Sequence, residues 1–297
     1  MALIHKISVL SLFLSSGCVV GDPLPSPRDL DQSWLVNKPR ILAARAEPAE
    51  PRPGDVVTFE ALFPDPTGEI TTTLWVACPP SDEADLLVAC MPDIEATTAT
   101  KGEEPSNGAL IIGVQPGFEP TYEVPLNVLD QAEDKNEGEI ITIQIVGMPD
   151  IDLEMDTGTE LDLNVFKIAT KGLVVSEALT PNNNPVVVDF FVNGASVDGQ
   201  TVKIQVDTTI TLEAKLQDDS VESYQYINSD GITEERTEEP YGLWYTTSGN
   251  IQGDTSIFPN LATSWTAPST PTSGTWWFVI RDRRGGLAWW SQPFEVE

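Results

Sequence analysis

The chain has 297 residues, a formal charge of −30 at pH 7 and 40% hydrophobic residues, with eight Trp among them. So acidic a chain repels nucleic acid, and binding to nucleic acid is therefore excluded. The hydrophobic content predicts a folded protein and argues against disorder. The single histidine is His5, which leaves the rest of the chain without the commonest general base and the usual transition-metal ligand. We therefore expect a protein that is not an enzyme and that uses no cofactor.

The amino terminus is typical of an export signal. Lys6 supplies a positive start, residues 7–14 form a short apolar run, and Ser15, Ser16 and Gly17 are small. The run is shorter than the roughly 20 residues that a transmembrane helix needs. Residues 1–17 are thus predicted to be a signal peptide that is cleaved before Cys18.

The stretch Ser15-Ser-Gly-Cys18 resembles the lipobox of bacterial lipoproteins, although Leu14 stands one position further from the cysteine than the leucine usual in that family. The resemblance implies that Cys18 is acylated, by palmitate among other chains, and anchors the protein to a membrane. Val19 stands where an aspartate would retain a lipoprotein in the inner membrane, which implies the outer membrane. Residues 18–39 are read as the lipidated cysteine and a proline-rich tether. The alternative is an ordinary cleaved signal in which Cys18 has no role.

Alternating apolar residues predict half-buried strands along most of the remaining chain. Val57, Phe59, Ala61 and Phe63 would share one face, as would Ile141, Ile143 and Ile145. The same period recurs at Ile210, Leu212, Ala214 and Leu216. Turn signals containing Pro, Gly, Asn and Asp separate these runs. The pattern predicts an all-β fold built from sandwiches.

Four landmarks occur twice in the same order, which suggests a tandem duplication. The repeated features are Val57-Thr-Phe-Glu-Ala61 with Ile210-Thr-Leu-Glu-Ala214, Leu74-Trp75 with Leu243-Trp244, Tyr122-Glu-Val-Pro125 with Trp265-Thr-Ala-Pro268, and the glycines Gly138 and Gly274. We expect a first domain at residues 40–170, a linker at 171–185 and a second domain at 186–297. The first domain would carry insertions around the cysteine loop and at residues 101–120. The second would carry an acidic one at 218–239.

Two features of the first domain suggest cross-links or ligands. Cys78 and Cys90 form an isolated pair in an exported chain, which predicts a disulfide bond. Further on, Asp150, Asp152, Glu154 and Asp156 alternate, so that their carboxylates could share a Ca²⁺ ion. The preferred interpretation of this acidic stretch is a strand or hairpin with a solvated face.

The end of the chain holds a Trp-x-Ala-Pro motif at residues 265–268, then a glycine, an apolar strand that ends in Arg and Asp, a Gly turn and a last strand. This order resembles bacterial immunoglobulin-like and PKD-like domains, and the resemblance extends more loosely over residues 40–166. It implies two tandem immunoglobulin-like β-sandwiches. It implies little about function, because such modules act as spacers, adhesins and docking surfaces alike.

Two tryptophan pairs, at residues 276–277 and 289–290, lie on the last two predicted strands. Because neighbours on a strand point to opposite faces, one ring of each pair could face outward, with Trp277 and Trp290 as the candidates. Arg281, Arg283 and Arg284 form a basic cluster that would orient an acidic partner. The competing interpretation packs the rings in the core beneath these arginines.

Together these features predict a lipid-anchored protein of the outer membrane that acts as a structural or protein-interaction module. The alternative is a carbohydrate-binding or adhesive lipoprotein that uses exposed tryptophans. Its partners would be the membrane, through the lipid, and an envelope protein or a glycan.

Overall fold

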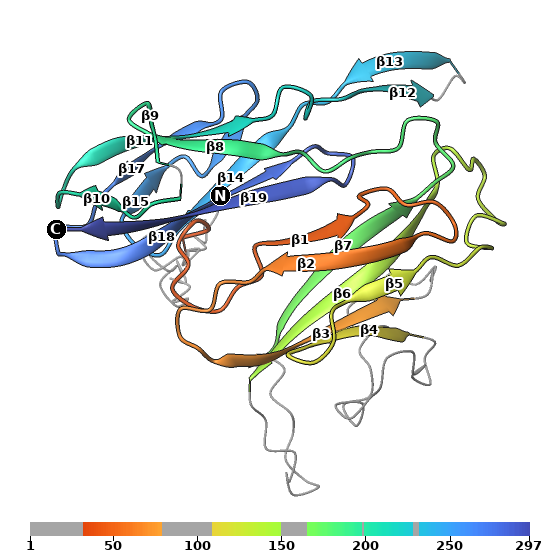
Figure 1. The fold of residues 1–297 in the computed structure, drawn as a ribbon, viewed down its shortest axis with the longest axis horizontal. Coiled ribbons are helices and arrows are strands. Elements are labelled where there is room, and N and C mark those ends of the chain that lie inside the picture. Colours follow the sequence, from red (N-terminus) through yellow and green to blue (C-terminus); the bar gives the residue numbers. More distant parts are fainter. Residues whose placement is uncertain (1–31, 79–108, 150–164, 198, 228–231) are drawn as a thin grey trace, which may run out of the picture. The chain divides into compact units, whose positions relative to one another are not determined.

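A computed structural model describes residues 32–78, 109–149, 165–197, 199–227 and 232–297 (Figure 1). These residues form strands and connections and contain no α-helix. Accordingly, the described part of the chain has no helix with the length and apolarity to cross a membrane. Ser33–Glu297 form one compact unit, within which the strands build two sandwiches.

The first sandwich pairs a three-stranded sheet, ordered β1-β2-β5, with a four-stranded sheet, ordered β4-β3-β6-β7. Neighbouring strands in both sheets are antiparallel. The strands are β1 (Ala43–Glu47), β2 (Val56–Leu62), β3 (Ile70–Cys78), β4 (Leu110–Gln115), β5 (Thr121–Glu123), β6 (Glu139–Pro149) and β7 (Lys167–Val175).

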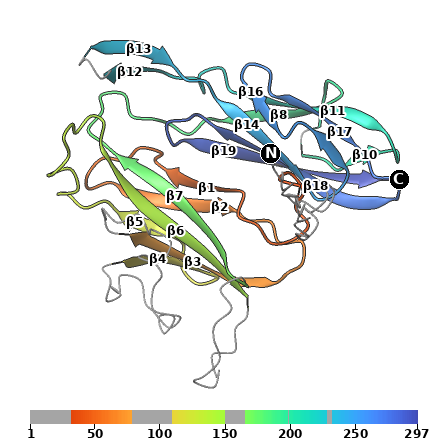
Figure 2. The same cartoon turned by 180° about the vertical axis from the view of Figure 1, so that it is seen from behind.

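The second sandwich pairs two five-stranded sheets, ordered β9-β8-β11-β17-β15 and β16-β14-β18-β19-β10. A separate two-stranded sheet consists of β12 (Ser223–Ile227) and β13 (Thr233–Thr237), and Figure 2 shows this hairpin extending beyond the end of the sheets. The other strands are β8 (Val187–Val192), β9 (Ala195–Ser196), β10 (Val202–Ile204), β11 (Thr209–Leu216), β14 (Tyr241–Thr246), β15 (Asn250–Gln252), β16 (Thr255–Ile257), β17 (Ala262–Thr266), β18 (Thr272–Arg281) and β19 (Leu287–Val296).

Each sandwich has its own apolar core between its two sheets. In β11 the burial alternates strictly, so that the predicted face of Ile210, Leu212, Ala214 and Leu216 is buried. In the first sandwich Trp75 is fully buried and packs 5.9 Å from Phe59, measured between ring centroids. In the second, Trp244 is fully buried against Phe190 and Phe278. The alternating sequence thus builds the two cores.

The two sandwiches repeat one topology. The order β1-β2-β5 corresponds to β8-β11-β17, and β4-β3-β6-β7 corresponds to β16-β14-β18-β19. The register corresponds as well, because Val57 lies opposite Tyr122 and Ile210 lies opposite Trp265. The arrangement is consistent with tandem immunoglobulin-like sandwiches, as the repeated landmarks predicted.

The structure places two segments differently from the prediction. Strand β7 continues to Val175, because residues 171–175 complete the sheet edge beside β6, so the connection starts at residue 176 and not at 171. The acidic insertion in the second sandwich contains the hairpin β12–β13, two strands that were not predicted.

Candidate functional site

Three asparagines in the connection between the sandwiches bind both of them. The Asn182 side-chain nitrogen donates to Asp282 Oδ2 at 2.9 Å, and that of Asn183 donates to Glu222 Oε1 at 2.6 Å. The Asn184 side chain donates to Ala46 O at 2.7 Å and accepts the backbone N–H of Leu287 at 3.0 Å. Asn184 uses both its amide donor and its amide acceptor, whereas the buried Oδ1 of Asn182 has no hydrogen-bond partner among the described residues.

The turn between β18 and β19, residues 282–286, lies against this connection. Asp282 is 1% exposed, and its carboxylate also accepts the backbone N–H groups of Arg284 at 2.7 Å and Gly285 at 3.0 Å. Burial raises the pKa of Asp282 above its usual value, and the hydrogen bonds act in the opposite direction. Gly286 permits the close packing, because a Cβ there would lie 2.1 Å from Asp282 Oδ2.

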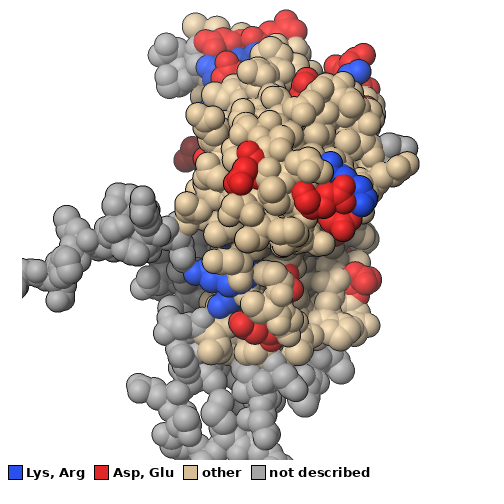
Figure 3. Space-filling model, turned by 90° about the vertical axis from the view of Figure 1, so that its left-hand side faces the viewer, with Lys and Arg blue, Asp and Glu red and all other residues tan. Residues whose placement is uncertain are grey.

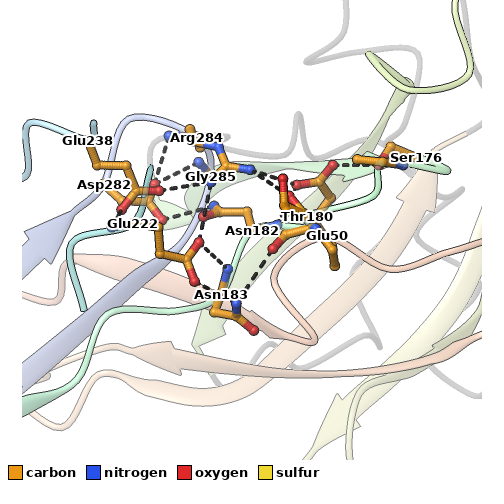
Figure 4. Close-up of polar contacts among 12 residues, drawn as sticks. Glu50, Ser176, Thr180, Asn182, Asn183, Glu222, Glu238, Asp282, Arg284 and Gly285 are labelled. Carbon is orange, nitrogen blue, oxygen red and sulfur yellow. Dashed lines mark hydrogen bonds and ion pairs between the residues drawn. The ribbon is translucent and has the colours of Figure 1, made fainter. Parts of the chain in front are cut away.

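Arg284 holds the charged centre of this region (Figure 4). Its guanidinium pairs with Glu238 at 3.1 Å, Glu222 at 3.3 Å and Glu50 at 3.5 Å. It also donates to the carbonyl of Thr180 at 3.3 Å. Burial raises the pKa of Glu238, which Arg284 and the backbone N–H of Glu222 counteract. Arg284 thereby ties together the first sandwich, the connection and the base of the hairpin.

Lys171 of β7 reaches the same turn from the first sandwich. Its side-chain nitrogen donates to Gly285 O at 2.6 Å, and the residue is 8% exposed. Burial lowers the pKa of Lys171 to about 8, while the negative charge of Asp282 acts against this shift and the positive charge of Arg281 adds to it. A buried lysine is costly, so its position here shows how tightly the turn is enclosed.

An apolar cluster continues the contact between the sandwiches. Val36, Leu42, Ala43 and Leu62 precede or belong to the first sandwich and pack on the second. Their partners on β14, β18 and β19 are Tyr245, Trp277, Val279 and Leu287. Alongside, the backbone of residues 34–36 bonds to Thr246 at the end of β14. We call the polar and apolar contacts together the junction, defined by residues 176–186, residues 282–286, Lys171, Arg284 with its three glutamates, and this apolar cluster.

The junction's chemistry suits holding two modules in one arrangement. Its carboxylates form ion pairs with Arg284 or accept hydrogen bonds from asparagine side chains and backbone N–H groups. Within the described ranges, no group of three or more His, Cys, Asp or Glu side chains is arranged to hold a metal ion.

The structure does not expose Trp277 and Trp290 together, as the outward-facing interpretation of the two pairs required. Trp277 is 8% exposed, because the first sandwich covers the outer face of β18, and Trp276 is fully buried in the core. The expectation that one ring of this pair is exposed is therefore wrong. Trp290 lies across from Phe278, on the core side of the sheet, and is half-buried. Trp277 and Trp290 thus lie on opposite faces of the same sheet.

The three arginines of the predicted basic cluster are not all exposed, and each bonds to a group of its own chain. Arg281 donates to Leu42 O at 3.3 Å, and Arg283, which is exposed, donates to Glu239 O at 3.0 Å. The side chain of Arg284 is 16% exposed and is neutralised by glutamates of its own chain. On the face shown in Figure 3, charged side chains form small separate groups among uncharged residues.

The remaining predicted sites lie wholly or partly outside the described residues. This applies to Cys18, to Cys90 and to the acidic residues Asp150, Asp152, Glu154 and Asp156. Cys78 ends β3 and is buried. The Cys78–Cys90 disulfide, the lipid on Cys18 and the Ca²⁺ site remain predictions.

The sequence analysis did not predict that the three asparagine side chains bond to both sandwiches. Residues 180–185 were interpreted only as part of the linker at 171–185, because Pro and Asn favour turns. Three successive asparagines between two prolines also place several hydrogen-bond donors and acceptors on a restricted backbone. This pattern was the sequence signal that could have indicated their bonding role.

No protein-family model matches the chain, and no curated protein matches it. Among solved structures, a nucleoside hydrolase-related protein from Saccharophagus degradans is 16% identical over 39% of this chain and 26% of its own, with a TM-score of 0.27. The three N-terminal domains of the outer capsid protein Hoc of bacteriophage RB49 are 11% identical over 87% of this chain and 59% of their own, with a TM-score of 0.22. The D0-D1 domain of intimin is 8% identical over 86% of this chain and 98% of its own, with a TM-score of 0.21. Scores this low carry no argument, so the fold assignment rests on strand order and register.

Proposed function

We propose that the chain is an exported, lipid-anchored protein of the bacterial outer membrane whose two immunoglobulin-like modules act as a structural or protein-interaction element without catalysis. The observation that supports this proposal is the junction, in which Arg284, Lys171 and three asparagines join the modules. Modules that work independently need no such contacts, whereas a stalk or a composite binding surface requires a defined arrangement of its parts.

The membrane part of the proposal is supported by Ser15-Ser-Gly-Cys18, which resembles a lipobox. Acylation with several chains gives stable anchoring, whereas one chain alone binds membranes only marginally. The proline-rich residues that follow would carry the modules away from the lipid.

Fractionation of bacteria that express the full chain tests the anchor. We expect the wild-type protein in the outer membrane and the Cys18→Ser variant in the soluble fraction. Val19→Asp is the matched variant, since it keeps the cysteine and should move the protein to the inner membrane. Full membrane association of Cys18→Ser would contradict the anchor.

The interaction role needs a separate experiment. We expect the purified full chain to recover a specific envelope protein from solubilised outer membrane. Recovery of no protein, together with saturable binding to cell-wall or surface glycans, would instead favour the carbohydrate-binding alternative. The burial of Trp277 argues against that alternative, because it removes one of the two rings on which it depended.

A further inference from the structure

The hairpin β12–β13 distinguishes the second sandwich from the first. It lies between β11 and β14, whereas the corresponding strands β2 and β3 of the first sandwich are joined by residues 63–69 alone. In the described part of the chain, β12 and β13 pair with each other and with no further strand. Among the described residues, each therefore has one backbone edge that pairs with no other strand (Figure 1).

The base of the hairpin is firmly attached to the junction. The backbone N–H of Glu238 donates to Glu222 O at 2.9 Å, and the N–H of Glu222 donates to Glu238 Oε2 at 3.0 Å. Arg284 pairs with both glutamates, and its guanidinium lies 4.4 Å from the ring centroid of Tyr224. A two-stranded hairpin alone is only marginally stable in water, so these contacts fix the direction in which it extends.

The hydrogen bond between Glu238 and Glu222 also determines which backbone groups of the hairpin point outward. In an antiparallel ladder, directly bonded pairs alternate with pairs whose N–H and C=O groups point away from each other. Residues 222 and 238 are a bonded pair in the register that places Tyr224 opposite Arg236 and Gln225 opposite Glu235. Gln225 therefore directs its N–H and C=O to the free edge of β12, as do Ser223 and Ile227. Glu235 does the same on β13.

The two free edges differ in charge. The β12 sequence, Ser-Tyr-Gln-Tyr-Ile, has no acidic or basic residue, whereas β13, Thr-Glu-Glu-Arg-Thr, has three charged residues. Charged side chains on an edge strand discourage pairing with another chain. In a chain of net charge −30, most surfaces repel a second copy, and the β12 edge is a place where two copies can meet without charge repulsion between the paired strands.

The β12 sequence is also nearly symmetric about its centre, because Tyr224 and Tyr226 flank Gln225. A two-fold interface requires a surface that is complementary to itself. Two antiparallel β12 strands centred on Gln225 would place each Tyr224 opposite Tyr226 of the other copy. Aromatic cross-strand pairs of this kind stabilise sheets.

We propose that two copies of this chain pair through their β12 edges, antiparallel and about a two-fold axis at Gln225, to form a four-stranded intermolecular sheet. This pairing names a second copy of the chain as the partner, and it rests on the proposed role of the chain as an interaction module. A five-residue strand buries less than the roughly 1,200 Å² of a standard stable interface, so the pair is weak in solution. Anchoring on one membrane would strengthen it by raising the effective concentration.

A cysteine at the axis provides the sharpest test. Directly bonded residues of an antiparallel pair have Cα atoms about 5.5 Å apart, which suits a disulfide bond. We expect Gln225→Cys in the full mature chain to form a covalent dimer under mild oxidation. Glu235→Cys is the matched control, because it lies directly across the hairpin on the opposite edge. Equal dimer yields from the two variants, or no dimer above the parent chain, would overturn the proposal.

Proline substitution tests the same edge without a cross-link. Gln225→Pro removes an outward N–H and leaves the bonds inside the hairpin in place, so it should abolish the self-association that sedimentation detects at high concentration. Glu235→Pro should leave it intact, with circular dichroism confirming that both variants fold. If neither variant alters association, the edge is not used.

The outcomes separate this proposal from the proposed function. Recovery of an envelope protein without self-pairing would refute the β12 pairing alone. Self-pairing without membrane association would refute the lipid anchor alone.

Discussion

The same connection is short in one sandwich and long in the other. Residues 63–69 join β2 to β3, whereas residues 217–240 join β11 to β14 and contain the hairpin. The cores nevertheless place a fully buried tryptophan at the equivalent position, since Trp75 lies on β3 beside the edge strand β4 and Trp244 lies on β14 beside the edge strand β16. The comparison teaches that core packing requires the same strand order in both sandwiches, whereas the connections can differ and carry different contacts.

The outer sheet faces differ as well. In the second sandwich, the outer face of β14, β18 and β19 is covered by Val36, Leu42, Ala43 and Leu62 of the first. The two modules are therefore not interchangeable. In the apolar cluster, the second contributes a sheet face, and the first contributes its first strands and the residues before them.

The largest effect should come from the two equivalent tryptophans. Trp75→Ala and Trp244→Ala should each lower the free energy of unfolding by about 3–5 kcal/mol, because each removes a fully buried ring. Urea denaturation followed by circular dichroism measures this. A loss below about 1 kcal/mol at either position would show that the two cores are not built alike.

Arg284→Ala should have the next largest effect. It would leave Glu238, whose side chain is 1% exposed, without its cation, and we expect a loss of about 2–3 kcal/mol. Arg283→Ala is the matched control, because Arg283 is exposed and adjacent, and it should cost less than about 1 kcal/mol. Equal losses would mean that the ion pairs of the junction contribute nothing specific to stability.

Lys171 should make stability depend on pH. Its pKa is about 8 in the folded chain against an ordinary value of 10.5, so between these values the unfolded chain holds a proton that the folded chain has lost. Stability should therefore rise with pH above 8, by at most about 1.4 kcal/mol per pH unit, and the full cost of the buried charge should apply below 8. Denaturation at several pH values from neutral to mildly alkaline measures the slope. Lys171→Met should remove this contribution, and an unchanged slope would contradict the assignment.

The sequence predicted those features that depend on near neighbours. The period of two in Ile210, Leu212, Ala214 and Leu216 correctly gave the buried face of β11, and the repeated landmarks anticipated the shared strand order. These signals are local, because a strand's own alternation determines which side chains can face a core.

The junction could not be predicted in the same way. Glu50 is 234 residues from Arg284, and no local pattern indicates that the two meet. Similarly, alternation places Trp277 on the outer face of its sheet but cannot say that another module covers that face. Interpreting Arg284 as a site for an external acidic partner was chemically reasonable, and the partner proved to be in the same chain.

The smallest expected effect concerns Arg45, at the margin of the junction. Its guanidinium lies 4.9 Å from the ring centroid of Trp289, and it pairs with Glu60 at 2.6 Å, with both charged side chains partly exposed. Exposed ion pairs and cation–π contacts each contribute little, so Arg45→Ala should lower the free energy of unfolding by less than about 1 kcal/mol. Because Trp289 also packs on the apolar cluster, its ring should stay in place after the arginine is removed, and the intrinsic tryptophan fluorescence of the chain should shift only slightly to the red. A loss above about 2 kcal/mol would show that Arg45 helps to hold the modules together, as Arg284 is expected to do.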